Sequence, residues 1–413
     1  MRLSLAFLTI GLLAAPLGAQ RSIVVSPTGS VRSVQTAIRA ASRHDTIVVD
    51  KGIYRESTTI VVDKPLTLIG RGWPVLDGQN ARQIMIVTAD SVTVRGFRFE
   101  HVGGSFLEDW AALRVDDATG CRITGNRFED SFFGIYLSSV TDCVVSGNVL
   151  RSARLTESLS GDGIHLWQSK HITIQDNSIT GHRDGIYFEF VHHTLIRRNV
   201  SEGNLRYGLH FMYSDDCRYI ENVFRGNGSG VAVMYTNRVE MTGNRFEGNW
   251  GSAAYGLLLK EISDGKLTGN VFMRNTTALF ADGANRLQAH RNDFVNNGWA
   301  VKLDASTENA RFTANNYIGN SFDVSSNSSE HTTTFAGNYW DSYEGYDLNR
   351  DGYGDVPFRP VRLFSAIVAQ NAPAIILLRS PFVRLLDSAE GLLPLFTPAG
   401  LADRRPAMTR VTR

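Results

Sequence analysis

The stretch GLHFMYSDDCRYIENVFRGN, residues 208–227, is followed by a counterpart of the same pattern, GVAVMYTNRVEMTGNRFEGN, residues 230–249. In both, short runs that alternate apolar and polar residues end at Gly or Asn. The pattern extends along the chain, and one Asn recurs at steps of 22, 29, 22, 23, 22, 26, 22, 24 and 22 residues, at Asn126, Asn148, Asn177, Asn199, Asn222, Asn244, Asn270, Asn292, Asn316 and Asn338. A period of about 22 residues with short strands and no helical pattern predicts a solenoid of stacked turns, or rungs.

Strict alternation assigns the two faces of one strand in every rung. The segments that follow the recurring Asn residues carry apolar residues at their second and fourth positions, as in GIYLSSV, GIHLWQS, GIYFEFV, GLHFMYS, GVAVMYT, GLLLKEI, ALFADGA and AVKLDAS. Because successive side chains on a strand point to opposite faces, these positions face the core and the third and fifth positions face outward. We therefore predict a right-handed parallel β-helix over residues 46–340, with the Asn amides hydrogen-bonded from rung to rung.

A second strand precedes each Asn, and all three cysteines occupy its inward positions. Three cysteines are too few, and odd in number, for a disulfide framework in an exported chain. Cys121, Cys143 and Cys217 are expected to be small buried hydrophobes. A bridge between Cys121 and Cys143, which lie on adjacent rungs, is the alternative.

The regions outside the solenoid have patterns of their own. Residues 1–19 have the basic start, apolar centre and small-residue exit of a secretory signal peptide. Residues 20–45 are expected to form an N-terminal cap with a short helix, residues 341–362 an Asp/Gly-rich closing loop, and residues 363–413 an apolar tail of short helices. The tail is expected to dock on a membrane partner or to serve as a plain C-terminal cap. Two lengthened rungs, 150–162 and 246–256, are expected to form walls beside segment 208–214.

The charge balance argues against nucleic acid as a partner. The formal charge is +1, and it falls to 0 when Arg2 leaves with the signal peptide. A chain without net charge is not expected to attract nucleic acid or another polyanion over long range. The signal peptide makes the mature protein extracytoplasmic.

The outward positions of the central rungs carry soft metal ligands. Met212 and Met234 are expected to stack on adjacent rungs, with His210 beside them, Glu189 one rung away and His165 two rungs away. Thioether and imidazole donors favour Cu(I) over Mg²⁺, Ca²⁺ or most zinc sites. The alternative is a methionine-rich contact patch for another protein.

Carboxylates on the same face raise an enzyme hypothesis that the spacing disfavours. Glu189 and Asp282 lie four rungs apart, roughly 19 Å at the strand spacing, which is too far for the paired carboxylates of sugar hydrolysis. Asp304 lies on the rung next to that of Asp282, but Lys302 is close to it, which indicates a solvated charged face. No catalytic residue is predicted.

The closing loop has the spacing of a calcium-binding loop. Four oxygen donors stand at its first, third, fifth and ninth positions, and Gly352 stands at the sixth, where a sharp turn is needed; the donors are Asp347, Asn349, Asp351 and Asp355. Phe358 replaces the bidentate Glu of the twelfth position, so a complete EF-hand is excluded. A structural Ca²⁺ site is predicted, and an Asp/Gly-rich turn without metal is the alternative.

Five runs of the chain carry a family resemblance: HRDGIYFEFV (182–191), EGNLRYGLHFMYSDD (202–216), GVAVMYTNRVEMTGNRFEGNWGSAAYGLLLKEI (230–262), NYWDSYEGYDLNRDGYGDVPFRPV (338–361) and LLRSPFVRLLD (377–387). They resemble the NosD family, the periplasmic maturation proteins of nitrous-oxide reductase. The resemblance covers nearly the whole mature chain. It implies a periplasmic accessory protein, not an enzyme, that works with an ABC-type permease and ATPase.

The resemblance further implies that such a protein accepts Cu(I) from a lipoprotein copper chaperone and helps to assemble the copper–sulfur centre of apo nitrous-oxide reductase. It supplies no ligand set, so the copper ligands proposed above rest on the register alone. Two other hypotheses stay open. One is a carbohydrate-binding or polysaccharide-modifying β-helix, although the Asp-Pro-His-Asp signature of alginate epimerases is absent. The other is a docking scaffold on which copper never rests.

Overall fold

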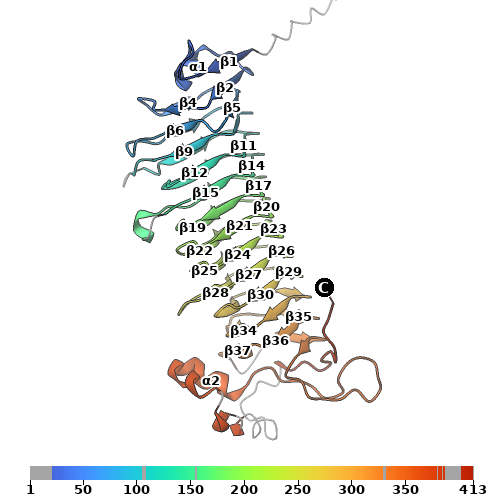
Figure 1. Cartoon of the computed structure of the whole chain (residues 1–413). Coiled ribbons are helices and arrows are strands. Elements are labelled where there is room, and N and C mark those ends of the chain that lie inside the picture. The colour runs from blue at the N-terminus through green and yellow to red at the C-terminus, as the bar shows by residue number, and fades with distance from the viewer. Residues whose placement is uncertain are drawn as a thin grey trace, which may run out of the picture.

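Three short strands per turn, separated by tight corners, wind the chain into a parallel β-solenoid of about 13 turns (Figure 1). This computed structural model describes residues 21–104, 108–153, 156–328, 332–378, 380–383, 385–386 and 401–412. The predicted signal peptide, residues 1–19, and residues 387–400 of the tail lie outside the described residues. The predicted parallel β-helix is confirmed.

The strands form three parallel sheets that run the length of the solenoid, and each complete turn contributes one strand to each sheet. Sheet I contains β1 (Ser22–Val25), β2 (Thr46–Asp50), β5 (Thr67–Arg71), β8 (Thr93–Arg95), β11 (Arg122–Thr124), β14 (Val144–Ser146), β17 (Thr173–Gln175), β20 (Leu195–Arg197), β23 (Arg218–Ile220), β26 (Glu240–Thr242), β29 (Lys266–Thr268), β32 (Gln288–His290), β35 (Arg311–Thr313) and β38 (Thr334–Ala336). Sheet II contains β4 (Ile60–Val62), β7 (Met85–Val87), β10 (Ala111–Asp116), β13 (Phe133–Ser138), β16 (Ile164–Trp167), β19 (Asp184–Glu189), β22 (Tyr207–Met212), β25 (Ser229–Met234), β28 (Tyr255–Lys260), β31 (Thr277–Asp282), β34 (Trp299–Leu303) and β37 (Phe322–Ser326). Sheet III contains β3 (Ile53–Tyr54), β6 (Val75–Asp77), β9 (Arg98–Glu100), β12 (Arg127–Glu129), β15 (Val149–Arg151), β18 (Ser178–Thr180), β21 (Val200–Glu202), β24 (Val223–Arg225), β27 (Arg245–Glu247), β30 (Val271–Met273), β33 (Asp293–Val295), β36 (Asn316–Ile318) and β39 (Tyr339–Trp340).

The core is built from columns of like side chains that the parallel register stacks on one another. The inward residues of sheet II predicted from alternation are buried, among them Leu209 and Phe211 of β22. On sheet III, Phe246, Phe272 and Phe294 stack with ring centroids 4.6 and 4.9 Å apart. The three cysteines are buried and free, as expected of small core residues, and no disulfide joins Cys121 to Cys143.

The predicted asparagine ladder is present at the corner between sheets I and III. Each Asn side-chain oxygen accepts the backbone N–H and the side-chain amide of the Asn on the previous rung, as Asn244 does for Asn222 at 3.0 Å. One member was misassigned: the ladder passes through Asn315, which is fully buried and bonded to Asn292 and Asn338. Asn316 instead faces Asp293 and Val411. Two adjacent Asn residues fit the period equally well, and only the hydrogen bonds separate them.

A second asparagine ladder lies at the corner between sheets III and II, and the sequence analysis missed it. Its members are buried or nearly so and bond in the same way, with Asn204 Nδ2 donating to Asn227 Oδ1 at 2.9 Å. The full set is Asn204, Asn227, Asn249, Asn275, Asn297 and Asn320. Each stands five residues after a member of the first ladder, which is the signal that could have revealed it.

The N-terminal end of the solenoid is closed by helix α1 (Val34–Ala40), as predicted. Val34, Ala37 and Ile38 are buried against the first strands. Ser33 caps the helix by accepting the Thr36 N–H at 3.1 Å, and a helix start of this kind needs such an acceptor. Parallel pairing already begins at β1, which precedes the helix and pairs with β2.

The C-terminal end is closed by residues 401–412, which return to the last rungs (Figure 1). Asp403 is fully buried, and its carboxylate accepts the Asn338 N–H at 3.0 Å and the Asn338 side-chain amide at 2.9 Å. The same carboxylate accepts from Trp340 Nε1 at 3.2 Å and from the Gly337 N–H at 3.2 Å. The first asparagine ladder therefore ends on a carboxylate supplied from 65 residues further along the chain.

Between the solenoid and this closing segment, the tail forms helix α2 (Leu363–Gln370) and the 3₁₀ helix η2 (Ala372–Leu377). Phe364 and Val368 pack on Trp299 and Phe322 of sheet II. Facing away from this contact are large apolar side chains that are 42–87% exposed, namely Ile375, Ile376, Leu377, Phe382 and Leu385. No helix in the described part of the chain is long and apolar enough to cross a membrane.

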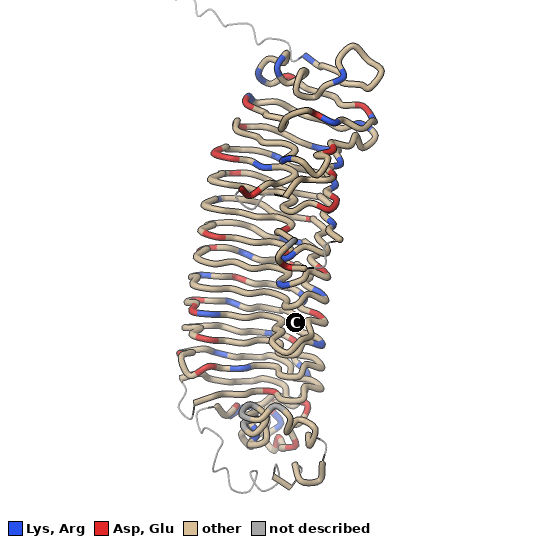
Figure 2. The backbone as a smooth tube through the Cα atoms, turned by 90° about the vertical axis from the view of Figure 1, so that its left-hand side faces the viewer, with Lys and Arg blue, Asp and Glu red and all other residues tan. Residues whose placement is uncertain are grey.

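Charged residues of both signs alternate along the turns (Figure 2). Many form ion pairs between neighbouring rungs, such as Arg198 with Asp176 and Arg286 with Asp264. These pairs place charges of opposite sign next to one another, in keeping with the near-zero net charge.

A buried carboxyl group near the C-terminal end makes stability depend on pH. Burial raises the pKa of Asp323 to about 6 from its ordinary value of 3.8, against the opposing charge of Arg362. Asp323 is neutral in both the folded and the unfolded protein below about pH 4. The free-energy cost of burying this side chain therefore grows between pH 4 and 6 and reaches its full value above pH 6.

Asp323→Asn is therefore expected to raise the free energy of unfolding at pH 8 by about 3 kcal/mol, because the variant never buries the charge. At pH 3.5 the variant and the wild type should be equally stable. Urea denaturation at both pH values measures the difference, and an equal gain at the two pH values would contradict the assignment.

Candidate metal site in a groove on sheet II

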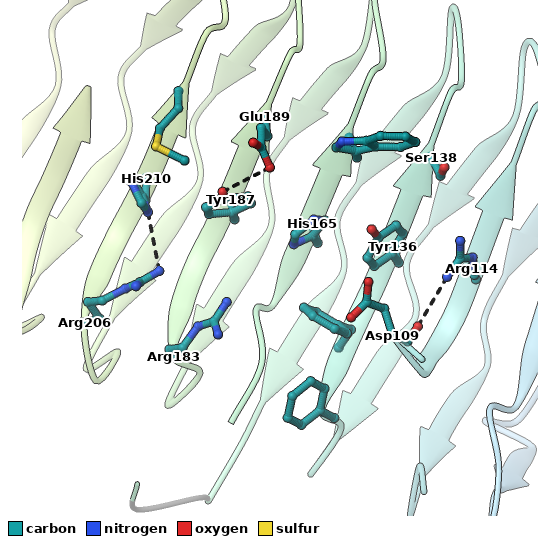
Figure 3. Close-up of a pocket in the computed structure, with 14 residues that line it drawn as sticks. Asp109, Arg114, Tyr136, Ser138, His165, Arg183, Tyr187, Glu189, Arg206 and His210 are labelled. Atoms are coloured by element: carbon teal, nitrogen blue, oxygen red, sulfur yellow. Dashed lines mark hydrogen bonds between the residues drawn. The ribbon is translucent and has the colours of Figure 1, made fainter. Parts of the chain in front are cut away.

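A groove of about 760 Å³ lies on the outer face of sheet II, across strands β10 to β22 (Figure 3). It is open to solvent and combines aromatic, basic and acidic side chains. The lining residues are Asp109, Arg114, Phe132, Phe133, Tyr136, Ser138, His165, Trp167, Arg183, Tyr187, Glu189, Arg206, His210 and Met212. Four of the five residues of the predicted copper set line it, and the fifth, Met234, does not; the four are His165, Glu189, His210 and Met212.

A column of rings forms the floor of the groove. Tyr136, His165 and Tyr187 stack with centroids 4.4 and 4.8 Å apart, and His210 meets Tyr187 edge-on at 5.1 Å. The column exists because the third residue of each repeated segment, such as GIYLSSV or GLHFMYS, faces outward and the register pairs these residues directly. Burial raises the pKa of Tyr136 to about 12, with Asp109 adding to the effect, so this phenol is neutral.

The carboxylate of Asp184 is buried behind the groove and binds side chains that line it. Asp184 is fully buried and receives Arg206 Nε at 2.9 Å, a second bond from Arg206 Nη2, and the Tyr207 N–H at 3.2 Å. His210 Nδ1 lies 3.4 Å from the same carboxylate. Burial raises the pKa of Asp184, but the bonds from Arg206 and His210 outweigh it, so the pKa lies below its ordinary value and the group is ionised.

A related arrangement occurs one rung earlier. Asp162 is fully buried, accepts from Arg183 Nη2 at 3.1 Å, and lies 2.8 Å from His165 Nδ1. In both places an aspartate behind the groove pairs with an arginine from the next rung, but Asp162 contacts the imidazole of its own rung and Asp184 that of the next rung. The sequence analysis missed all four of these supporting residues. The available signal was an Asp-Gly pair three residues before the outward ring, at 162–163 and 184–185.

His210 has one ring nitrogen without a partner. Its Nε2 is buried and accepts or donates no hydrogen bond, whereas Nδ1 faces Asp184 and Arg206. We assign the proton to Nδ1, because ionised Asp184 is the stronger partner and Arg206 is already bonded to that carboxylate. Nε2 then keeps a free lone pair, and a carboxylate behind the far nitrogen is the usual support of a metal-binding histidine.

The register brings the predicted thioethers together. Glu189, Met212 and Met234 are direct partners on β19, β22 and β25. Both methionines are half-buried, and His210 stands two residues before Met212 on the same face. Glu189 accepts the Tyr187 hydroxyl at 3.4 Å. His165 is separated from His210 by the Tyr187 ring, so it belongs to the second arrangement.

Two expectations about this surface need correction. His210 was expected to be exposed, but it is only 7% exposed, because Tyr187, Tyr207 and Arg206 pack around it. The lengthened rungs 150–162 and 246–256 were expected to form walls, yet none of their described residues lines the groove. The wall comes instead from Asp109 and from Phe132 and Phe133.

The closing loop folds its predicted calcium ligands onto its own backbone. Asp347 accepts the N–H groups of Asp351 and Gly352 at 3.1 and 2.9 Å, and Asp355 accepts the Leu348 N–H at 2.7 Å. Asp351 pairs with Arg405 at 3.1 Å. Among the described residues, no group of three or more His, Cys, Asp or Glu side chains is arranged to hold a metal ion. The calcium site stays a prediction.

Comparison with known proteins finds that the chain is similar to one protein family. The family model described as "Periplasmic copper-binding protein (NosD)" matches residues 151–345, which contain the groove's histidines and both methionines. The chain is 29% identical over 375 residues to the "Probable ABC transporter binding protein NosD" of Pseudomonas aeruginosa, with 86% of each chain covered. It is 27% identical over 377 residues to the protein of the same name from Stutzerimonas stutzeri, covering 86% of this chain and 85% of that one.

Solved structures confirm the fold alone. The catalytic unit of the GH87 α-1,3-glucanase from Streptomyces thermodiastaticus superposes with a TM-score of 0.59 at 16% identity, covering 80% of this chain and 69% of that chain. The sequence matches extend over most of the chain, and they agree with the resemblance carried by residues 182–191, 202–216 and 338–361. Over most of its length the chain is therefore similar to proteins of the NosD family.

Proposed function

We propose that this protein receives Cu(I) in the periplasm as transient cargo, on Met212, Met234 and His210. It would accept the ion from a lipoprotein copper chaperone and serve assembly of the copper–sulfur centre of nitrous-oxide reductase, together with an ABC-type permease and ATPase. The family description as periplasmic and copper-binding, and the names of the two relatives, support this role. The single observation that carries the residue assignment is the buried, unpartnered Nε2 of His210 beside the methionine pair.

The donor set suits Cu(I). Two thioethers and one imidazole are soft ligands, and such a set discriminates against Mg²⁺ and Ca²⁺, which prefer oxygen. Asp184 would hold the His210 ring in the tautomer that presents Nε2. The methionines are only half-buried, so the cargo stays within reach of a partner that delivers or removes it.

The charges of the groove also favour a cation. Its three arginines, Arg114, Arg183 and Arg206, are each paired with an aspartate. Among the described residues, Asp109 and Glu189 have no cationic partner at salt-bridge distance, which leaves two negative charges when both imidazoles are neutral. A groove of this sign attracts a cation and disfavours a polyanion.

The exposed apolar side chains of the tail support docking on the transporter. Ile376 is 87% and Phe382 54% exposed, on a segment whose other face packs on the end of the solenoid. Contiguous exposed apolar surface of this kind marks protein or membrane contacts. The tail would thus contact the permease and leave the groove accessible.

The Met212→Ala/Met234→Ala variant tests the ligand assignment. Removal of both thioethers leaves one ligand of the set, and we expect Cu(I) affinity to fall about 100-fold, or about 2.7 kcal/mol. Anaerobic titration against a chromogenic Cu(I) chelator measures it. Met273→Ala is the matched control, because Met273 is a half-buried methionine on sheet III away from the groove. Equal affinity and stoichiometry in the double variant and the wild type would refute the assignment.

A further inference from the structure

The two methionines of the proposed copper site lie between side chains of opposite charge. On the outer face of sheet II, the register aligns one residue from each of β19, β22, β25 and β28 in a row, namely Glu189, Met212, Met234 and Lys260. Neighbours in such a row are about 4.8 Å apart at the strand spacing. A carboxylate therefore stands next to the first thioether and an ammonium group next to the second.

Both thioethers can be reached from solvent. Met212 and Met234 are half-buried, and Met212 lines the groove. The methionines of the core differ from them in this respect, because Met85 and Met241 are at most 1% exposed. A small oxidant dissolved in the surrounding water therefore meets the methionine pair but not the core methionines. Methionine is among the residues that such oxidants convert, and the product is the sulfoxide.

The charges on either side of the pair suit the oxidation of a thioether by hydrogen peroxide. The sulfur lone pair attacks one peroxide oxygen, an S–O bond forms, the O–O bond breaks and hydroxide leaves. Lys260 stands where its ammonium group can protonate the hydroxide to water, and Glu189 where its carboxylate can take the proton of the hydroxysulfonium ion, which becomes the sulfoxide. Sulfur is oxidised by two electrons, the peroxide is reduced to water, and solvent restores the charges of both side chains.

We infer that Met212 and Met234 are a site of reversible oxidation to methionine sulfoxide by peroxides, promoted by Glu189 and Lys260, and that the oxidised site no longer holds Cu(I). The loss of Cu(I) rests on the proposed function, whereas the oxidation itself does not. A sulfoxide presents a polar oxygen in place of the soft thioether that Cu(I) prefers. Methionine sulfoxide reductases restore the thioether, so oxidation switches the site off and reduction switches it on again.

The oxidation rates of individual methionines test the site. The copper-free chain is treated with dilute hydrogen peroxide, and peptide mapping by mass spectrometry follows each methionine over time. Met273 is the internal reference, because it is also half-buried but has Glu247 and Val295 as its register partners. We expect Met212 and Met234 to be oxidised about tenfold faster than Met273. This factor is smaller than that of a fixed general acid, because a lysine side chain is flexible.

Lys260→Gln tests the proton donor. The variant should lower the oxidation rate of Met234 to about that of Met273 and leave the rate of Met273 unchanged. Lys302→Gln is the control, because it removes a lysine from the same sheet two rungs further along, and it should change neither rate. Equal rates at the pair and at Met273 in the wild type, or an unchanged rate of Met234 in Lys260→Gln, would overturn the inference.

Cu(I) titration before and after oxidation tests the switch. Conversion of both methionines to sulfoxides should lower the affinity for Cu(I) about 100-fold, as is expected for Met212→Ala/Met234→Ala, and treatment with methionine sulfoxide reductases should restore it. Unchanged affinity after oxidation would overturn the switch. A wild-type chain that does not bind Cu(I) before oxidation would overturn the proposed function instead, and the oxidation rates would still decide the site.

Discussion

Asp184→Ala is expected to lower the free energy of unfolding by about 3 kcal/mol, because removal of one partner from a buried ion pair leaves the other charge uncompensated. Arg206, which is two-thirds buried, would lose both of its bonds to the carboxylate, and the Tyr207 N–H would lose its acceptor. His210 would also lose the group that orients it. Guanidinium denaturation followed by circular dichroism measures the loss.

Asp176→Asn is the control for that experiment. It removes the charge from an arginine pair between rungs, with bonds of 2.8 and 2.9 Å to Arg198, but both partners are exposed, and Asn tolerates the left-handed backbone of this position. Exposed pairs contribute little because water screens them, so the denaturation midpoint should hardly move. Equal losses of unfolding free energy in the two variants would show that burial does not determine how much Asp184 contributes to stability.

Asp403→Ala should destabilise the C-terminal rungs by about 3 kcal/mol or more, because each buried donor left without an acceptor costs about 1–3 kcal/mol. The donors that lose their acceptor are the Asn338 N–H, the Asn338 amide and Trp340 Nε1. Thermal unfolding reports the overall effect. Hydrogen exchange should show faster exchange around β38 and β39 and little change at β1 and β2.

Asp403→Asn is the graded control, because it keeps one acceptor oxygen at the end of the ladder. Its loss should lie between those of the wild type and Asp403→Ala. If both substitutions left exchange at Asn338 unchanged, the carboxylate would not be the cap of the ladder. Deletion of residues 363–413 removes Asp403 as well as the apolar helices, so a transporter-binding test on the tail must keep residues 401–412.

Much of the fold was predictable because a parallel solenoid repeats one local pattern. The alternation in segments such as GLHFMYS assigned Leu209 and Phe211 to the core and His210 and Met212 to the outer face. Burial confirms the first assignment, and the residues that line the groove confirm the second. The recurring Asn marked the corner of each rung. Where two Asn residues were adjacent, at Asn315 and Asn316, the period could not choose between them, because the choice depends on hydrogen bonds to other rungs.

The candidate site was predictable only in part. The pairing of Met212 with Met234 followed from register, since a strand position determines its neighbour on the next rung. The contact between His210 and Asp184 could not be predicted in this way. Asp184 lies 26 residues earlier in the chain, and its effect on His210 depends on its complete burial. The role of Asp403 was equally hidden, since a single carboxylate in the tail carries no periodic signal.

By itself the sequence determined the solenoid, the faces of its strands and the outward row of soft ligands, because these depend on spacing along the chain and on the two-residue period of a strand. The tertiary structure alone decided which outward residues are exposed, which nitrogen of His210 is free and what closes the asparagine ladder. These properties depend on contacts between rungs and on the return of the C-terminal segment. Distance in space, rather than spacing in the chain, sets them.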